Sequence, residues 1–320
     1  MKIIGYHYIR NFSNQYKNPN GIRFIHINNF CNQLNFFKQK FYLPTIEEFF
    51  LFKKGIINLP KDSIILSFDD GLTDHYKYVF SELMDRKMWG IFFVPSRPYI
   101  ENKHIGTFAL HHLLGKVETK KLIHEIELII KNSNLKFEIN LNCLNKKIID
   151  LKTEESRVLF LKQLINSKNY FKNEKLKDIL IDQLIEKYIP QFDLYDVYLK
   201  PKEIYEMENS GMIIGAHSIT HNYMSDLDEN EQFKEIEESF KILNSITGKL
   251  KFRLFGYPYG KLNTINNITF DCLEKLNVEA AFLYNEPKLS LVYNQTNRKN
   301  KYLIPRIRPD FFDFGKNYKY

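Results

Sequence analysis

The sequence predicts an α/β fold, either a layered sheet or a barrel, that is interrupted by a helical insertion. Short apolar runs typical of buried strands alternate with helix-like stretches in residues 1–100 and again in 201–320. This alternation favours parallel strands joined by helices. Residues 101–200 contain no convincing strand and carry amphipathic stretches instead. We therefore expect one domain over residues 1–320, with a mainly helical insertion at about 101–200.

The first third of the chain supplies three strand candidates and two helix candidates. The strands are runs rich in Ile, Leu, Phe and Val, and the helices place apolar side chains at helical intervals. The strands are KIIGYHYI (2–9), SIILSF (63–68) and GIFFVPS (90–96), and the helices are INNFCNQLNFFKQ (27–39) and YKYVFSELMDRK (76–87).

The insertion and the last third complete the pattern. Amphipathic helices are expected at 111–133 and 176–189, and Gly211 and Gly248 end two later helices. The remaining elements are helices at 203–210, 228–247 and 267–277, strands at 212–217, 252–257 and 278–284, and a strand-like piece within 301–312.

Composition and charge restrict the class of protein. Hydrophobic residues make up 44% of the 320 residues, so the chain can bury a core. The net charge of +8 fits a lysine-rich surface, or alternatively a basic face for phosphate-bearing substrates. No dense basic cluster stands out, so no nucleic-acid partner is expected. Three cysteines without a CxxC motif give no disulfide framework.

The sequence also carries no signal for a membrane or for export. The N-terminal stretch has the pattern of a strand rather than of a signal peptide, and no segment approaches ~18 consecutive apolar residues. We expect a cytoplasmic protein without stable membrane insertion. The pattern does not select an oligomeric state.

Two motifs follow predicted strands, where parallel α/β folds gather functional groups. Asp69 and Asp70 end the strand at 63–68, and Gly71 permits a tight turn. His217 and His221, four residues apart, follow the strand at 212–217. Taken alone, the aspartate pair could simply begin a loop and cap a helix. The histidine pair could likewise be ordinary surface or core histidines. Together, one carboxylate and two imidazoles make a three-ligand metal site with positions open for water, and the second carboxylate can act as its base.

These residues carry a family resemblance. SFDDG (67–71) and HSITH (217–221) look like the first two signature motifs of the NodB-type polysaccharide deacetylases, and FGYPYG (255–260) resembles the family's aromatic–proline turn. The resemblance covers residues 1–100 and 201–320. The full order of motifs, from YHYI to IPR, also looks like a subgroup encoded among surface-glycan biosynthesis genes.

The resemblance implies a deformed (β/α)7-type barrel and metal-dependent removal of N-acetyl groups from amino sugars. It implies Asp69 as general base and the backbone amide of Tyr259 as oxyanion donor, with Ser218 supporting the histidines from outside the coordination sphere. The implied metal ligands are Asp70, His217 and His221. Zinc is the first expectation for the ion, with cobalt, nickel or iron as alternatives.

The chain departs from the best-known members at two positions. Their proton-donating histidine lies near the C-terminus, and this chain has no histidine after His221. Their arginine beside the base stands where this chain has Gly256. We expect Arg306 to replace that arginine, with Arg308 as the competing choice. The candidates for the acid are His7, His75, His111 and His112, or a protonated Asp69 that returns its own proton.

Aromatic residues at strand ends raise a further possibility. Tyr6 and Tyr257, with Tyr8 and Tyr259, could form a stacking platform for a sugar ring, or they could belong to ordinary packing. The leading function is hydrolysis of an N-acetyl amide on a nucleotide- or lipid-linked amino sugar. The alternatives are hydrolysis of a formamide or ureide at the same site, and a barrel that binds glycan without catalysis.

Overall fold

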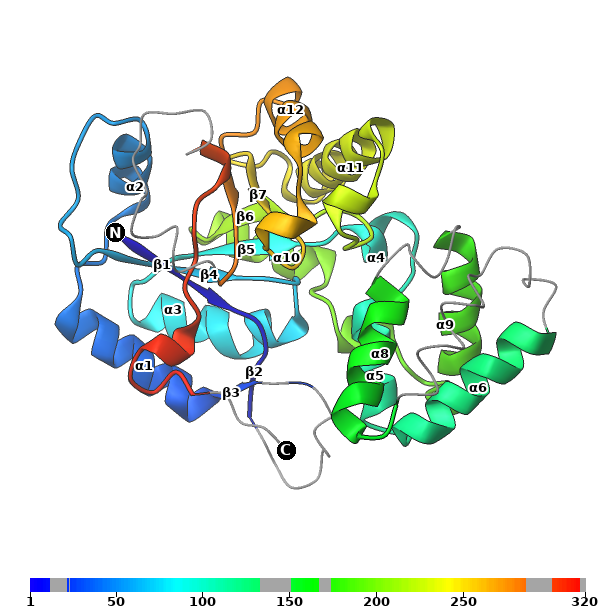
Figure 1. Ribbon diagram of the computed structural model, residues 1–320. Helices are drawn as coiled ribbons and strands as arrows, with labels where there is room; N and C mark the ends of the chain where they lie inside the picture. Colours follow the sequence, from blue (N-terminus) through cyan, green and yellow to red (C-terminus); the bar gives the residue numbers. More distant parts are fainter. Residues whose placement is uncertain (12–21, 23, 133–150, 167–173, 286–300, 317–320) are drawn as a thin grey trace. The chain divides into compact units, whose positions relative to one another are not determined.

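The computed structural model describes all residues except 12–21, 23, 133–150, 167–173, 286–300 and 317–320 (Figure 1). The chain divides into two compact units. The first contains the described residues of Met1–Phe12, Arg23–Asn102 and Tyr195–Tyr318, and the second contains mainly those of Lys103–Leu194. The single-domain organisation over residues 1–320 stays a prediction.

The first unit is built on a curled parallel sheet with the strand order β1-β4-β5-β6-β7-β8 (Figure 1). Residues 304–307 bridge its two edges, because Ile304 pairs with Phe282 of β8 and Ile307 pairs with Ile4 of β1. These contacts confirm the deformed (β/α) barrel expected from the sequence. The strands are β1 (Lys2–Tyr6), β4 (Ile64–Phe68), β5 (Gly90–Val94), β6 (Ile213–Ala216), β7 (Leu254–Gly256) and β8 (Ala280–Phe282).

Helices alternate with these strands, as the sequence predicts. They are α1 (Ile27–Lys40), α2 (Ile46–Lys53), a π-helix (His75–Phe80) continued by α3 (Ser81–Asp85), α4 (Arg97–Ile100), α10 (Pro201–Asn209), α11 (Glu229–Thr247) and α12 (Asn267–Lys275). A small parallel pair joins β2 (Ile9–Arg10) to β3 (Ile25–His26). Asp228 caps α11 in a reciprocal box with Glu231, which fixes where this long helix begins.

The two faces of the sheet bury different apolar clusters, because side chains alternate along a strand. Leu66 and Phe68 of β4 face the cluster that includes the covering helices α1, α10 and α11. Ile65 of the same strand faces the opposite side, with Phe93 and Phe282. This alternation decides which residues after each strand end reach the barrel interior.

The second unit is helical within the described residues. Its helices are α5 (Gly106–Leu114), α6 (Thr119–Asn132), α8 (Glu154–Asn166) and α9 (Glu174–Tyr188). They share a cluster that contains Leu113, Ile126, Leu161 and Leu180. Part of the insertion expected at 101–200, residues 133–150 and 167–173, lies outside the described residues.

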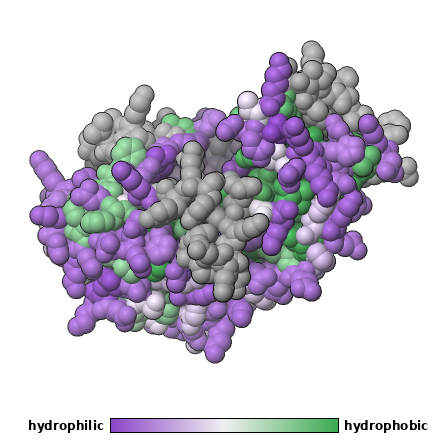
Figure 2. All heavy atoms as spheres, turned by 90° about the horizontal axis from the view of Figure 1, so that it is seen from below, coloured by the Kyte–Doolittle hydropathy of each residue, from purple (hydrophilic) through white to green (hydrophobic). Residues whose placement is uncertain are grey.

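The surface agrees with the charged composition. On the face drawn in Figure 2, hydrophilic side chains predominate and hydrophobic ones form smaller groups between them. Among the described residues, no helix combines the length and the apolar character that crossing a bilayer would require.

Candidate metal centre and active site

The turn after β4 gives Asp69 and Asp70 different neighbours. The backbone N–H of Asp69 donates to the carbonyl of Tyr6 at 2.9 Å. Asp70 has φ of 78° and Gly71 has φ of 55°, both in the left-handed region that Asp tolerates and Gly adopts freely. A Cβ on Gly71 would lie 2.9 Å from Cγ1 of Val94. The tight turn therefore requires this glycine, and it allows the two adjacent carboxylates to contact different residues.

The loop after β6 carries both histidines. The backbone N–H of His217 donates to the carbonyl of Val94 at 3.1 Å, and that of Ser96 donates to the carbonyl of Ser218 at 3.0 Å. Ser218 and His221 both have left-handed backbones, with φ of 62° and 61°. The Ser218 hydroxyl accepts the backbone N–H of His221 at 3.1 Å. Ser218 thus supports the second histidine through the backbone rather than through its ring.

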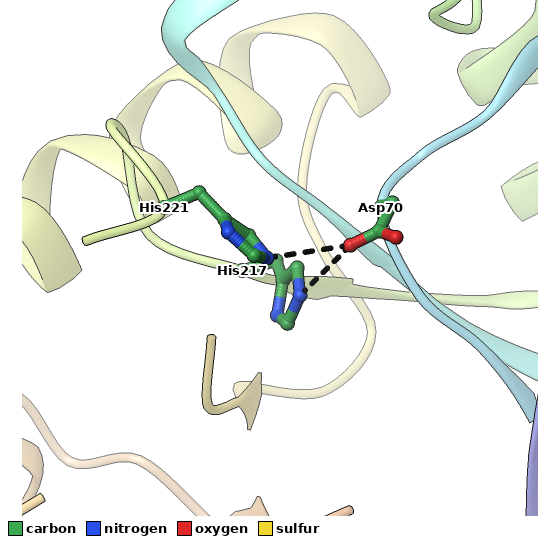
Figure 3. A group of neighbouring side chains, drawn as sticks. All are labelled: Asp70, His217 and His221. Atoms are coloured by element: carbon green, nitrogen blue, oxygen red, sulfur yellow. Dashed lines mark ion pairs between the residues drawn. The ribbon is translucent and has the colours of Figure 1, made fainter. Parts of the chain in front are cut away.

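Asp70, His217 and His221 converge on one point (Figure 3). Oδ1 of Asp70 lies 3.3 Å from Nε2 of His217 and 3.4 Å from Nε2 of His221. All three residues are buried, and one ligand atom from each lies within 4.8 Å of the others. Nδ1 of His217 donates to the carbonyl of Gly256 at 2.7 Å, so its Nε2 keeps a lone pair for an ion. The donor set fits a divalent metal.

Electrostatics favour the ionised form of this ligand carboxylate. When no ion is bound, burial opposes ionisation of Asp70, but the charge of His7 and the hydrogen bonds that Nε2 of His217 and Nε2 of His221 then donate outweigh it. They hold the pKa of Asp70 well below its ordinary value. A metal ion therefore meets a carboxylate that is already deprotonated.

Asp69 forms a buried ion pair with Arg306. Nη1 and Nη2 of Arg306 donate to Oδ1 and Oδ2 of Asp69 at 2.5 and 2.8 Å. Nε of Arg306 donates to the carbonyl of Leu283 at 2.7 Å, which fixes the plane of the guanidinium. Burial by itself would raise the pKa of Asp69, but the charge of Arg306, followed by those of His217 and His7 and the Arg306 hydrogen bonds, outweighs it and lowers that pKa. Asp69 is thus kept as a carboxylate beside the metal ligands.

The structure explains why this arginine comes from a late segment. A Cβ on Gly256 would lie 2.7 Å from Cγ of Phe93, so the position where related proteins carry their arginine has no room for a side chain. The guanidinium carbon of Arg306 lies 5.1 Å from the centre of that phenyl ring. Arg308, the competing choice, pairs with Asp310 instead.

His7 lies beside both carboxylates. Its Nε2 is 3.8 Å from Oδ2 of Asp69 and 4.0 Å from Oδ2 of Asp70. One third of its side chain, 33%, is exposed, whereas the carboxylates are almost fully covered. Its ring also meets the edge of Tyr284 at 4.6 Å between centroids. His7 is therefore the histidine that the structure places at the open side of the site.

The other histidines considered for the acid are His75, His111 and His112. His75 begins the π-helix, is fully buried, and its ring lies 5.5 Å from that of Phe68. Its Nε2 donates to the carbonyl of His7 at 3.0 Å, so it supports the backbone of His7. His111 and His112 belong to α5 of the second unit.

Of the two alternatives for Tyr6 and Tyr257, the structure shows ordinary packing and contradicts the stacking platform. Both side chains are fully buried in the cluster beneath the covering helices. The Tyr6 hydroxyl donates to Oε1 of Gln33 at 2.5 Å, and the Tyr257 hydroxyl donates to the carbonyl of Tyr302 at 2.8 Å. Strand alternation is the reason, because each tyrosine continues the face of its strand that points away from the barrel interior.

Other tyrosines border the site. The ring of Tyr259 lies 4.8 Å from that of His221 and 4.4 Å from that of Tyr223. Tyr259 has φ of 62°, so the turn that carries its amide is left-handed. Tyr284, which touches His7, was not singled out from the sequence, although its position at the end of the strand expected at 278–284 is the kind of signal that could have found it.

Comparisons with known proteins agree with this fold and site. The family model described as polysaccharide deacetylase matches residues 177–281, which is less than half of the chain but includes both metal-site histidines. A comparison with curated proteins finds no match.

Solved structures of deacetylases share the fold. A Streptococcus pyogenes deacetylase, PplD, in complex with acetate has a TM-score of 0.56 at 15% identity, over 96% of this chain and 91% of that one. A de-N-acetylase from Aggregatibacter actinomycetemcomitans has a TM-score of 0.52 at 14% identity, over 99% and 96%. IcaB from Ammonifex degensii has a TM-score of 0.52 at 15% identity, over 97% and 92%.

The described residues combine a parallel barrel with a buried Asp–His–His group at its strand ends. The family match and the fold confirm the resemblance predicted from the sequence. The chain is similar to polysaccharide deacetylases over the matched residues 177–281 and in its fold, and the activity that this similarity suggests is proposed below.

Proposed function

We propose that the chain removes the N-acetyl group from an amino sugar, with a divalent ion, zinc first, held by Asp70, His217 and His221. The observation that carries the proposal is the Asp69–Arg306 pair beside these ligands. A carboxylate that is buried, ionised and adjacent to a three-ligand metal site is the base that amide hydrolysis at a metal requires.

Each residue has a defined part in this reaction. When bound, the ion would lower the pKa of water and polarise the acetyl carbonyl. Asp69 accepts a proton as the water oxygen attacks the acetyl carbon, and Arg306 holds that carboxylate in place. The backbone N–H of Tyr259 donates to the oxygen that gains negative charge. The carbon–nitrogen bond then breaks and leaves acetate and a free amine.

The leaving nitrogen needs a proton, because an amide anion is a poor leaving group. His7 is our candidate to give it, and the support is that its Nε2 lies 3.8 and 4.0 Å from the two carboxylates and that 33% of its side chain is exposed. The alternative is that Asp69 returns the proton that it took from water. Both routes balance the proton, and they differ in whether His7 is required.

The carrier of the sugar is the finer part of the proposal. A net charge of +8 suits a substrate with phosphate groups, such as a nucleotide- or lipid-linked intermediate of surface polysaccharide biosynthesis. The cytoplasmic location expected from the sequence belongs to the same proposal, and cell fractionation tests it.

The test loads the purified protein with zinc, cobalt, nickel or iron and measures acetate released from nucleotide- and lipid-linked N-acetyl sugars. Release that disappears in His217→Ala supports the proposal. If no metal form releases acetate from any of these substrates, the proposal is refuted. Formate scored in the same assay would indicate the formamide alternative, and a wild type that holds no metal would indicate a glycan-binding barrel.

A further inference from the structure

We propose that Glu235 of α11 is a positioning residue that holds His221 on the metal by fixing the loop between the two histidines. The inference rests on the metal site of the proposed function. Glu235 lies outside that site and touches none of its three ligand side chains in the hydrogen bonds described below.

Glu235 accepts hydrogen bonds from the middle of the loop. Its Oε2 accepts the backbone N–H of Ile219 at 2.7 Å and that of Thr220 at 2.9 Å. Its Oε1 accepts the Thr220 hydroxyl at 2.8 Å. The carboxylate is buried, with 8% exposure, so little water competes for these three hydrogen bonds.

The two residues that Glu235 binds lie between two residues with a left-handed backbone conformation. Ser218 and His221 have φ of 62° and 61°, a region that non-glycine residues adopt at a cost when the surroundings enforce it. The loop therefore tends to relax toward another conformation unless it is held. Glu235 supplies that restraint at the two intervening residues.

The two histidines depend on this restraint to different degrees. His217 comes directly after β6, and its backbone N–H and Nδ1 bond to the carbonyls of Val94 and Gly256. His221 comes at the far end of the loop, and the backbone bond to Ser218 Oγ is internal to the same loop. Loss of Glu235 should therefore displace His221 and leave His217 in place.

A second link runs from the same helix to the same loop. The Ser239 hydroxyl donates to the carbonyl of Glu235 at 2.7 Å and lies 2.9 Å from the hydroxyl of Ser96. Ser96 in turn holds the carbonyl of Ser218 through its backbone N–H. The helix, the end of β5 and the loop are thus joined, so the carboxylate of Glu235 starts from a fixed position.

The experiment separates the reach of the side chain from its charge. Glu235→Gln keeps the length and an oxygen acceptor for the two N–H groups, whereas Glu235→Asp keeps the charge but is one methylene shorter. Metal-free proteins are titrated with Zn²⁺ in a calorimeter. We expect the Gln variant to bind close to wild type and the Asp variant to bind about 10- to 100-fold more weakly, as for other supporting residues of metal ligands.

Two further variants complete the design. Glu238→Ala, on the same helix, where the half-exposed side chain pairs with Lys241, is the matched control and should leave the dissociation constant unchanged. In a double-mutant cycle, Glu235→Asp should add nothing to the loss caused by His221→Ala, because both remove the same ligand, but it should add to His217→Ala. Thermal unfolding of the metal-free proteins checks that each variant is folded.

The outcomes are distinguishable. If the Gln variant loses affinity as far as the Asp variant, or if the Asp variant binds as wild type does, the positioning role is overturned while the metal site stands. A double variant with His221→Ala that is weaker than His221→Ala alone also overturns it. If the wild type binds no Zn²⁺, the proposed function fails first, independently of Glu235.

Discussion

Replacement of Arg306 by leucine tests the electrostatic design of the site. Arg306 and Asp69 are 0% and 2% exposed, so the change leaves a carboxylate buried without its cation. Breaking a buried pair from one side costs about 3–5 kcal/mol, and the carbonyl of Leu283, which loses the Nε donor, adds about 1–3 kcal/mol. We therefore expect the free energy of unfolding at neutral pH to fall by several kcal/mol.

The pH dependence of that loss isolates the contribution of Asp69. In the wild type, the pKa of folded Asp69 is lowered, so its stabilisation is present above the unfolded pKa and disappears as pH falls through the folded value. In the variant, burial is opposed only by the charges of His217 and His7, and because burial is the largest influence we expect the pKa of Asp69 to rise above its ordinary value. Between the unfolded pKa and that raised value, the folded variant binds more protons than its unfolded chain, so its stability falls with rising pH by up to about 1.4 kcal/mol per unit.

The assay is urea denaturation of both metal-free proteins at a series of pH values from about 4.5 to 8. The difference between wild type and Arg306→Leu should widen as pH rises and should lose this slope when Asp69→Asn is added to both. Arg308→Leu is the control, because its partly exposed pair with Asp310 is worth no more than about 1 kcal/mol. A constant difference across the series would refute the reasoning.

Three further variants test the assigned roles. Asp69→Asn should keep the metal affinity and lose about 10²- to 10⁴-fold in turnover, whereas loss of metal would mean that the roles of Asp69 and Asp70 are reversed. His7→Asn should lower kcat by a similar factor at saturating metal, and an unchanged kcat would assign the proton on the leaving nitrogen to Asp69. Tyr257→Phe removes a buried hydrogen bond to the carbonyl of Tyr302. It should lower the free energy of unfolding by about 1 kcal/mol and leave KM unchanged. A raised KM would mean that this tyrosine contacts the substrate.

The alternation of side chains along a strand shows which site residues could be predicted from the sequence. Asp69 continues the face of β4 that carries Ile65 and Ser67, and this face points to the barrel interior, where Arg306 also lies. Tyr6 continues the other face of β1, with Ile4, and is buried beneath helices. The alternation of side chains along β1 could have shown that Tyr6 is not part of a substrate platform. Its position at a strand end could not have shown this by itself.

The sequence by itself determined the chemistry that is local in the chain. Asp69 and Asp70 at one strand end, and His217 and His221 after another, are short motifs next to apolar runs, so their residue types and their place in a parallel fold can be read directly. The helical character of the insertion is local in the same way, because it depends on a periodicity within each segment.

Only the tertiary structure decided which distant residues complete the site. Arg306 is 237 positions from Asp69, and its selection over Arg308 depends on the bridging of residues 304–307 between β8 and β1. The contacts of Glu235 with the loop and of His7 with both carboxylates arise in the same manner. No local pattern encodes such contacts, because they result from how the strands close around a packed interior rather than from spacing along the chain.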